Sequence, residues 1–344
     1  MEIFIGGVGS VVPPLVSIET AIEQGLCPPD KAELHELGGA AVAGDRPAPE
    51  LALAAAQDAL KRHGSGGDNL GLLLYVDVWH QGPDGWLPHY YLQRHLTGGE
   101  VLALEVRQGC NGMFNALELA AGYLRGDPRR RDILIVAAEN FGTPLIDRWR
   151  TGPNLIMGDG ASALVLTAQP SFAQLMAVES VTIAAGEELH RRGEEFFPPG
   201  VTTGRQVDFA ARTDAFVELT MADEELWAIW AMINQQLVEV VERACATAGI
   251  GIDDITRVAF TNLGRESVEE RCMGALGIPM SRSTWTHGRD IGHVGASDQV
   301  IALDHLLATG ELRPGDHLLM AGVGPGVTVS CALVRITDTP PWTS

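Results

Sequence analysis

Basic residues are scarce in this sequence. Lysine and arginine together number 24 against 44 aspartates and glutamates, which gives a formal net charge of -20 at pH 7. A chain this acidic repels the phosphates of nucleic acids and of anionic membranes, so broad binding to either is excluded. An anionic ligand would need a local group of basic side chains.

Long apolar runs and a basic leader segment are also missing. No run of apolar residues reaches the length that spans a bilayer, and the chain opens directly on a strand-like stretch, Ile3 to Ile5. We therefore expect a cytoplasmic protein without a membrane partner.

Cysteine usage excludes two further classes of protein. The five cysteines form no C-x-x-C pair and no compact set with histidine. Their odd number and wide spacing support neither a disulfide framework nor a structural zinc site. We expect no metal ion and no tightly bound cofactor.

The composition is otherwise that of a folded protein. Hydrophobic residues make up 46% of the 344 positions and charged residues 20%. This chain can bury a sizeable core, and its length fits two domains or one duplicated unit.

Cys110 stands between two glycines, Gly109 and Gly112, just before a run with helical spacing from Asn115 to Leu124. The free amides and the dipole at a helix N-terminus favour a thiolate, which makes a cysteine nucleophilic. A lone cysteine is otherwise a small core residue. The flanking glycines allow the backbone to approach closely on both sides of the sulfur and favour the reactive role.

The order of predicted elements in the first half recurs in the second half. A strand, a helix and two further strands are expected at residues 70–78, 115–124, 132–138 and 161–166, and again at residues 255–261, 299–307, 317–321 and 328–334. This pattern predicts an α/β fold built from two halves, residues 1–170 and 171–344.

A pseudo-two-fold relation between the halves would bring the loop before the Gln299 helix to the Cys110 helix. That loop reads Gly292-His293-Val294-Gly295-Ala296-Ser297 and carries a histidine. Asp298 follows it, either to orient the imidazole or to serve as an acid at the helix N-terminus. We therefore predict that Cys110, His293 and Asp298 meet.

Four segments, in this order, resemble ketoacyl-ACP synthase III of the thiolase superfamily. They are the Cys110 segment, Gly158-Asp159-Gly160-Ala161, the Gly292 loop and Gly322-Val323-Gly324-Pro325-Gly326-Val327-Thr328. The resemblance spans nearly the whole chain. It implies a five-layered αβαβα fold, a homodimer, and an acyl group carried on Cys110 as a thioester, delivered from CoA or from the phosphopantetheine of an acyl carrier protein.

The same resemblance implies roles for further residues. The amides of Gly326 and Cys110 would form the oxyanion hole that stabilises each tetrahedral step. Arg148 and Arg150 lie roughly where the family places an arginine for the donor's phosphates. An ordinary solvated surface turn is the alternative for these two arginines.

The chain departs from the family at the residues that bind a decarboxylating malonyl thioester. A synthase has a histidine where Thr261 or Asn262 stands, and an asparagine where His293 stands. Cys110, His293 and Asp298 instead suit deprotonation of an incoming hydroxyl. This arrangement resembles the synthase III-like acyltransferases of natural-product pathways, which acylate alcohols such as sugar hydroxyls.

Three readings stay open. The preferred one is an O-acyltransferase that works through acyl-Cys110. The others are a starter-unit condensing enzyme, with Asn262 and His293 in exchanged roles, and a catalytically silent partner of a carrier protein or synthase. Thr261 and Asn262 are expected at the acyl or acceptor pocket, whose size depends on how residues 79–95 and 187–223 fold; these segments show no periodicity and leave the acyl group and acceptor undefined.

Overall fold

The computed structural model describes residues 1–98, 100–127, 129, 131–222 and 224–343. Nine strands of this part of the chain form one sheet, in the order β5-β4-β6-β7-β1-β8-β11-β10-β9. Their bounds are β1 (Phe4–Val11), β4 (Leu70–Val76), β5 (Leu102–Val106), β6 (Asp132–Glu139), β7 (Gly160–Thr167), β8 (Ala173–Thr182), β9 (Ile255–Ala259), β10 (His317–Gly324) and β11 (Thr328–Ile336). The short strands β2 (Leu15–Ser17) and β3 (Gly39–Ala41) pair separately.

Helices surround this sheet and also pass through the middle of the molecule. Their bounds are α1 (Ile18–Glu23), α2 (Pro29–Leu34), α3 (Ala48–His63), α4 (Pro88–Leu96), α5 (Gly112–Gly126), α6 (Gly200–Thr203), α7 (Phe209–Met221), α8 (Glu224–Ala248), α9 (Arg265–Val268), α10 (Trp285–Ile291) and α11 (Asp298–Ala308). No helix in the described ranges is long and apolar enough to cross a bilayer.

Apart from the edge strand β5, the strand order reads the same from both ends of the sheet. The series β4-β6-β7-β1 is matched by β9-β10-β11-β8, and the two series meet where Ile5 of β1 pairs with Ala173 of β8. The first pair of each series is parallel and the following pairs are antiparallel. The boundary expected between residues 170 and 171 falls in the connection between β7 and β8.

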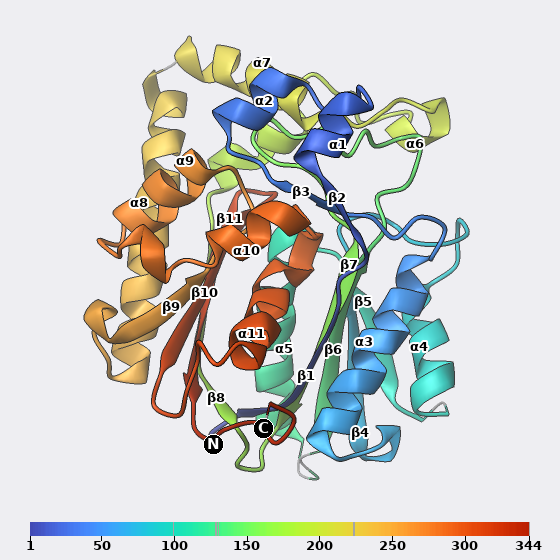
Figure 1. Ribbon diagram of the computed structural model, residues 1–344, viewed down its shortest axis with the longest axis vertical. Coiled ribbons are helices and arrows are strands. Elements are labelled where there is room, and N and C mark those ends of the chain that lie inside the picture. The colour runs from blue at the N-terminus through green and yellow to red at the C-terminus, as the bar shows by residue number, and fades with distance from the viewer. Residues whose placement is uncertain (99, 128, 130, 223, 344) are drawn as a thin grey trace.

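The two halves of the sheet enclose a central layer of helices. Figure 1 shows α5 and α11 between them, with α3 and α4 outside the first half and α8 outside the second. Alternating side chains fill the layers: Ile133 and Ile135 of β6 pack toward α5 and α11, whereas Leu134 and Val136 pack toward α3. Successive strand residues point to opposite faces, so a strand covered on both sides is apolar throughout. The predicted αβαβα fold is confirmed.

Two local expectations differ from the structure. The nucleophile helix α5 begins at Gly112 rather than near Asn115, because one 3-10 turn, Gly109–Asn111, leads directly into it. Residues 79–95, expected to be irregular, include most of α4, which starts at Pro88. Proline is well suited to the first turn of a helix, since its missing N–H has no helical partner there.

Candidate active site

Cys110 lies in the turn that starts α5, pressed against a loop from the other half of the chain. Gly109 adopts a φ of 58°, and a Cβ on it would lie 2.6 Å from the Cδ atom of Pro325. Only glycine fits both the left-handed conformation and this close approach. The two glycine-rich segments therefore meet at the nucleophile.

The three predicted catalytic side chains form one chain of contacts. The Cys110 sulfur lies 2.9 Å from Nε2 of His293, and Nδ1 of His293 lies 2.6 Å from Oδ2 of Asp298. His293 is 2% exposed and Asp298 is 1% exposed. The prediction that these residues meet is confirmed.

Asp298 is itself held in place by backbone amides. Its Oδ1 accepts a hydrogen bond of 2.7 Å from the Val294 amide, and its Oδ2 accepts one of 2.8 Å from the Asn262 amide. A carboxylate that accepts from amides on both oxygens is fixed in orientation, so the ring of His293 is fixed as well. Asp298 thus orients the imidazole while it opens α11.

The charge of His293 depends on its two neighbours. Burial on its own would lower the pKa of His293, but the adjacent Cys110 and Asp298 charges raise that pKa well above its usual range. A protonated imidazole next to the sulfur stabilises the thiolate form of the cysteine. The site therefore favours a protonated imidazole beside the sulfur.

The other four cysteines lie in a different environment. Cys27, Cys245, Cys272 and Cys331 are buried, whereas Cys110 is partly exposed. Burial raises the pKa of the Cys272 thiol strongly and that of the Cys331 thiol to about 12. Neutral buried thiols are poor nucleophiles.

A cavity of about 400 Å³ opens beside Cys110 and His293. Part of its wall comes from residues 189–217 and from α8, and consists of Leu189, His190, Phe209, Thr213, Val217, Trp227, Trp230 and Ile233. Residues 187–222 therefore shape the pocket as expected, while Asp223 lies outside the described residues. The segment 79–95 borders a neighbouring cavity instead, through Trp79 to Gly85.

The two residues expected in the acyl or acceptor pocket have different positions. Thr261 lines the cavity, and its buried Oγ1 has no hydrogen-bond partner. Asn262 does not line it, because its side-chain amide donates 2.8 Å to the carbonyl of Gly292 and packs against Gly288. The pocket role predicted for Asn262 is wrong; this side chain supports the histidine loop.

The two arginines predicted to bind the donor's phosphates also have different positions. Arg148 forms a two-point ion pair with the buried Asp159, at 2.9 Å on both branches. Its guanidinium faces inward, so the phosphate role predicted for Arg148 is wrong. Arg150 is 48% exposed and stands at a shallow cavity that shares Gly152 and Pro153 with the Cys110 cavity.

Two further residues hold the site, and sequence reasoning had missed both. The Asn111 amide donates to the carbonyls of Gly322 and Thr328, which ties the nucleophile turn to the closing loop. The fully buried Glu139 accepts from the Val78 amide and from Gln81, and burial raises its pKa well above the usual range. Asn111 adjoins the cysteine in sequence, but its partners lie over 200 positions away. The role of Gly326 and Cys110 as oxyanion donors stays a prediction.

Comparisons with known proteins agree with this geometry. The family model for 3-oxoacyl-[acyl-carrier-protein] synthase III matches residues 104–184, and the model for its C-terminal part matches residues 245–336. The beta-ketoacyl-[acyl-carrier-protein] synthase III of Clostridium perfringens strain SM101 is 25% identical over 85% of this chain and 86% of its own length. That of Rhizobium meliloti strain 1021 is 25% identical over 96% of this chain and 98% of its own length.

Solved structures extend the comparison. The acyltransferase ChlB3 is 59% identical, with a TM-score of 0.94 over 99% of this chain and 100% of that chain. The 3-oxoacyl-(acyl carrier protein) synthase III of Pseudomonas aeruginosa PAO1 shares the fold, with a TM-score of 0.79 at 19% identity over 99% of this chain and 100% of that chain. Fold and site together define an acyl-transferring enzyme of the thiolase superfamily. Within it, the chain belongs to the ketoacyl-ACP synthase III-like acyltransferase family.

Proposed function

We propose that the enzyme moves an acyl group from a phosphopantetheine thioester, through Cys110, to an alcohol. The observation that carries this proposal is the Cys110–His293–Asp298 chain of contacts, with distances of 2.9 Å and 2.6 Å. A histidine oriented by a carboxylate beside an acylated residue is the arrangement that activates an incoming hydroxyl. The acceptor class that resemblance favours is a sugar hydroxyl in a polyketide or antibiotic pathway.

In the first half-reaction, the Cys110 thiolate attacks the donor's carbonyl carbon. The bond from that carbon to the donor sulfur breaks, and the departing pantetheine thiolate takes the proton of His293. The products are acyl-Cys110 and a free thiol, with a neutral imidazole left beside the thioester. Loss of the thiolate charge removes one of the two influences that raise the pKa of His293.

In the second half-reaction, neutral His293 accepts the proton of the alcohol while the alcohol oxygen attacks the thioester carbon. The carbon–sulfur bond then breaks, an ester leaves, and the thiolate–imidazolium pair returns. Asp298 stabilises the positive ring through the Nδ1 hydrogen bond. His293 thus regains in the second step the proton that it gave up in the first.

The mouth of the cavity carries two basic side chains. Arg150 and Lys31 both border the shallow cavity that adjoins the Cys110 cavity. Lys31 donates to the carbonyls of Trp149 and Gly152, and burial lowers its pKa to about 8. Asp30 and Glu33 border the same cavity, and Arg150 is paired with Asp147 at 3.0 Å. The phosphates of CoA or of a carrier-bound pantetheine would therefore bind there by taking the place of Asp147 beside Arg150.

A decarboxylative condensing activity is the second candidate, and the position of Asn262 disfavours it. Its side-chain amide is bonded to Gly292 and so is not free to bind the carbonyl of a malonyl thioester. A silent partner protein is the third candidate. Intact-mass measurement after incubation with acyl thioesters tests it, since a silent protein gains no acyl mass. Release of CO2 from malonyl thioester would favour the condensing enzyme instead.

We also propose a homodimer built on the edge strand β5. Leu102 and Leu104 are 50% and 45% exposed on this strand, which ends the sheet. An apolar edge strand with free backbone groups is a template for pairing with a second copy. Sedimentation analysis should find a dimer, and Leu104→Lys should shift it toward monomer; an unchanged mass would contradict this interface.

A further inference from the structure

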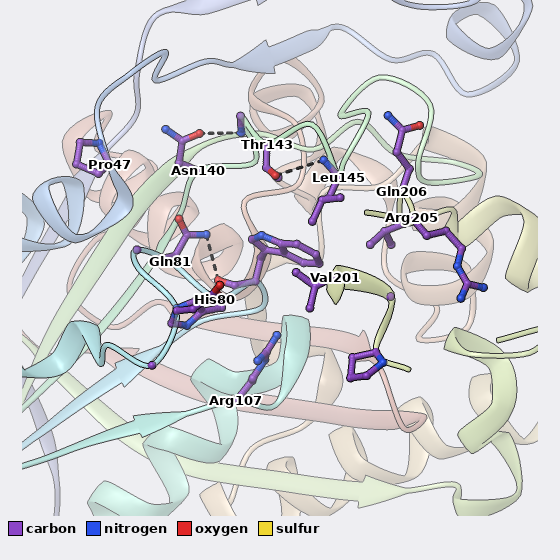
Figure 2. Close-up of a pocket in the computed structure, with 18 of the residues that line it drawn as sticks. Pro47, His80, Gln81, Arg107, Asn140, Thr143, Leu145, Val201, Arg205 and Gln206 are labelled. Atoms are coloured by element: carbon purple, nitrogen blue, oxygen red, sulfur yellow. Dashed lines mark hydrogen bonds between the residues drawn. The ribbon is translucent and has the colours of Figure 1, made fainter. Parts of the chain in front are cut away.

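A second cluster of titratable side chains lies away from Cys110. Asp77 follows β4, His80 follows it in the same loop, and Glu105 lies on the neighbouring strand β5. One ligand-type atom from each of the three side chains lies within 4.8 Å of the others. His80 borders a cavity of about 840 Å³, shown in Figure 2, which also holds Arg107.

Asp77 is the anomalous member of this cluster. Its side chain is 0% exposed, and neither carboxylate oxygen has a hydrogen-bond partner. Oε2 of Glu105 is likewise buried without a partner. Buried carboxylates in proteins are otherwise paired, hydrogen-bonded or bound to a metal, because desolvation of an unpaired charge is costly.

The surrounding groups do not neutralise these carboxylates. Nδ1 of His89 lies 3.9 Å from Glu105, and burial lowers the pKa of His89 so that its ring stays neutral near pH 7. Arg107 lowers the pKa of Asp77, but burial and Glu105 outweigh it and raise that pKa to about 7. The cluster therefore has a surplus of negative charge or holds a proton in place of a cation.

One ring nitrogen of His80 is held by a backbone carbonyl. Its Nε2 lies 3.1 Å from the carbonyl of Pro83, so this nitrogen carries the hydrogen and donates. Nδ1 is the ring nitrogen left to bind a metal ion. A histidine ligand in proteins usually donates its other N–H to a carbonyl or carboxylate in this way, which fixes its tautomer and orientation.

We propose that Asp77, His80 and Glu105 bind one divalent cation. Two carboxylates and an imidazole suit Mn²⁺, and Mg²⁺ and Zn²⁺ are alternatives that share this ligand chemistry. Ligand atoms lie about 2.0–2.2 Å from such ions, so the three side chains must draw together slightly. The cavity beside His80 supplies the entry path and space for water ligands.

The ion would fix the loop that separates the two cavities. Val78, between Asp77 and Trp79, lines the cavity of Cys110, and Trp79 lines the other cavity while packing on the cluster that contains Phe141. The cation therefore acts on the wall of the acyl cavity and takes no part in acyl transfer. Sequence alone did not indicate this site, because His80 and Glu105 are far apart in the chain and form no compact ligand motif.

The proposal is tested by Mn²⁺ binding to the intact protein. The chain is stripped with EDTA, and Cys110 is alkylated with iodoacetamide so that its sulfur cannot bind metal. Electron paramagnetic resonance then counts bound Mn²⁺ through the loss of the free-ion signal. We expect one ion per chain. Asp77→Asn should bind Mn²⁺ about 100-fold more weakly than the parent, or more weakly still, since changes to residues that only support a metal ligand can already lower metal affinity 10–100-fold.

Two further variants make the result specific. His80→Ala removes a proposed ligand from a partly exposed position. It tests the same site if Asp77→Asn fails to fold. Asp84→Asn is the control, because Asp84 lines the cavity that His80 borders, lies outside the cluster and undergoes the same replacement of Asp by Asn. No Mn²⁺ binding by the parent chain at millimolar concentration, or equal binding by parent and His80→Ala, would overturn the proposal.

Discussion

Nε2 of His293 lies 2.9 Å from the sulfur of Cys110, although 183 positions separate the two residues. Each residue lies in a glycine-rich loop at the start of a central helix, α5 or α11, and the two helices come from opposite halves of the chain. The contact therefore depends on the duplication, which brings equivalent loops together at the pseudo-two-fold axis. The predictions below concern this contact and its surroundings.

Cys110→Ala should abolish acyl transfer and leave the fold intact. Cys110 is the partly exposed cysteine beside a histidine, whereas the other four are buried and two have strongly raised pKa values. Intact mass followed by peptide mapping after incubation with an acyl thioester should place the acyl group on Cys110. Acylation of Cys272 or Cys331 would refute the assignment.

Arg148→Ala should destabilise the protein rather than change donor binding. It would leave Asp159 buried and unpaired, and removal of one partner of a buried ion pair costs about 3–5 kcal/mol. Urea unfolding measures this loss. A variant as stable as the parent would show that the pair has no structural role.

Arg150→Ala is the matched comparison, because this arginine is half-exposed at the cavity mouth. It should unfold like the parent but show a higher KM for the CoA- or carrier-bound donor and a weaker dependence of KM on salt. Arg150 is paired with Asp147 at 3.0 Å, but an exposed pair is weak, and a cation at a binding site acts mainly through such salt-sensitive attraction. Unchanged KM and salt dependence would make Arg150 an ordinary surface residue.

Val217→Phe should restrict the acyl group. Val217 lines the cavity beside Cys110, and added bulk there should lower kcat/KM for large acyl donors by about 10-fold or more, with little effect on acetyl donors. Val201→Phe is the control, since Val201 lines the neighbouring cavity. If neither variant changes kcat/KM for large donors relative to acetyl donors, the 400 Å³ cavity does not hold the acyl chain.

Asp77 should make the metal-free protein less stable as pH rises. Its folded-state pKa is about 7, above the unfolded value of about 3.9, so the neutral form stabilises the fold. This contribution is fully present below about pH 4 and is lost as pH rises through about 7.

Asp77→Asn does not titrate at this position, so it should exceed the parent in stability by an amount that grows between pH 5 and pH 8. The difference at pH 8 should be about 1–4 kcal/mol, and bound Mn²⁺ should reduce or reverse it. Urea unfolding of both proteins in EDTA at each pH measures it. A difference that does not change with pH would contradict the raised pKa.

Part of this site could be predicted from the sequence, because the residues next to each catalytic side chain carry the signal. Cys110, His293 and Asp298 each adjoin a glycine-rich helix start, and repetition of the element order predicts which starts meet. Arg148 could not be assigned in this way, because nothing in its neighbourhood indicates that the side chain turns inward to Asp159. The cavity wall from α7 could not be placed either, because it depends on how a segment without periodicity folds back over Cys110.

His293→Ala should separate the two half-reactions. An alcohol has a pKa far above neutrality, so its attack on the thioester needs a base, and the oriented imidazole is that base. Acylation of Cys110 makes a smaller demand, because the thiolate is already favoured at the helix start. The variant should accept the acyl group, more slowly than the parent, and lose about 10²–10⁴-fold in transfer to the alcohol.

Asp298→Asn should show a milder form of the same defect, since it weakens the hold on the Nδ1 tautomer without removing the base. Single-turnover measurement from preloaded acyl-Cys110 isolates the second step in each variant, and the gain of acyl mass isolates the first. Asn262→Ala, which loses the bond to Gly292 but keeps the base, is the structural control. If His293→Ala passes the acyl group to the alcohol at the parent rate, the proposed mechanism is wrong and the condensing reaction becomes the better account of Cys110.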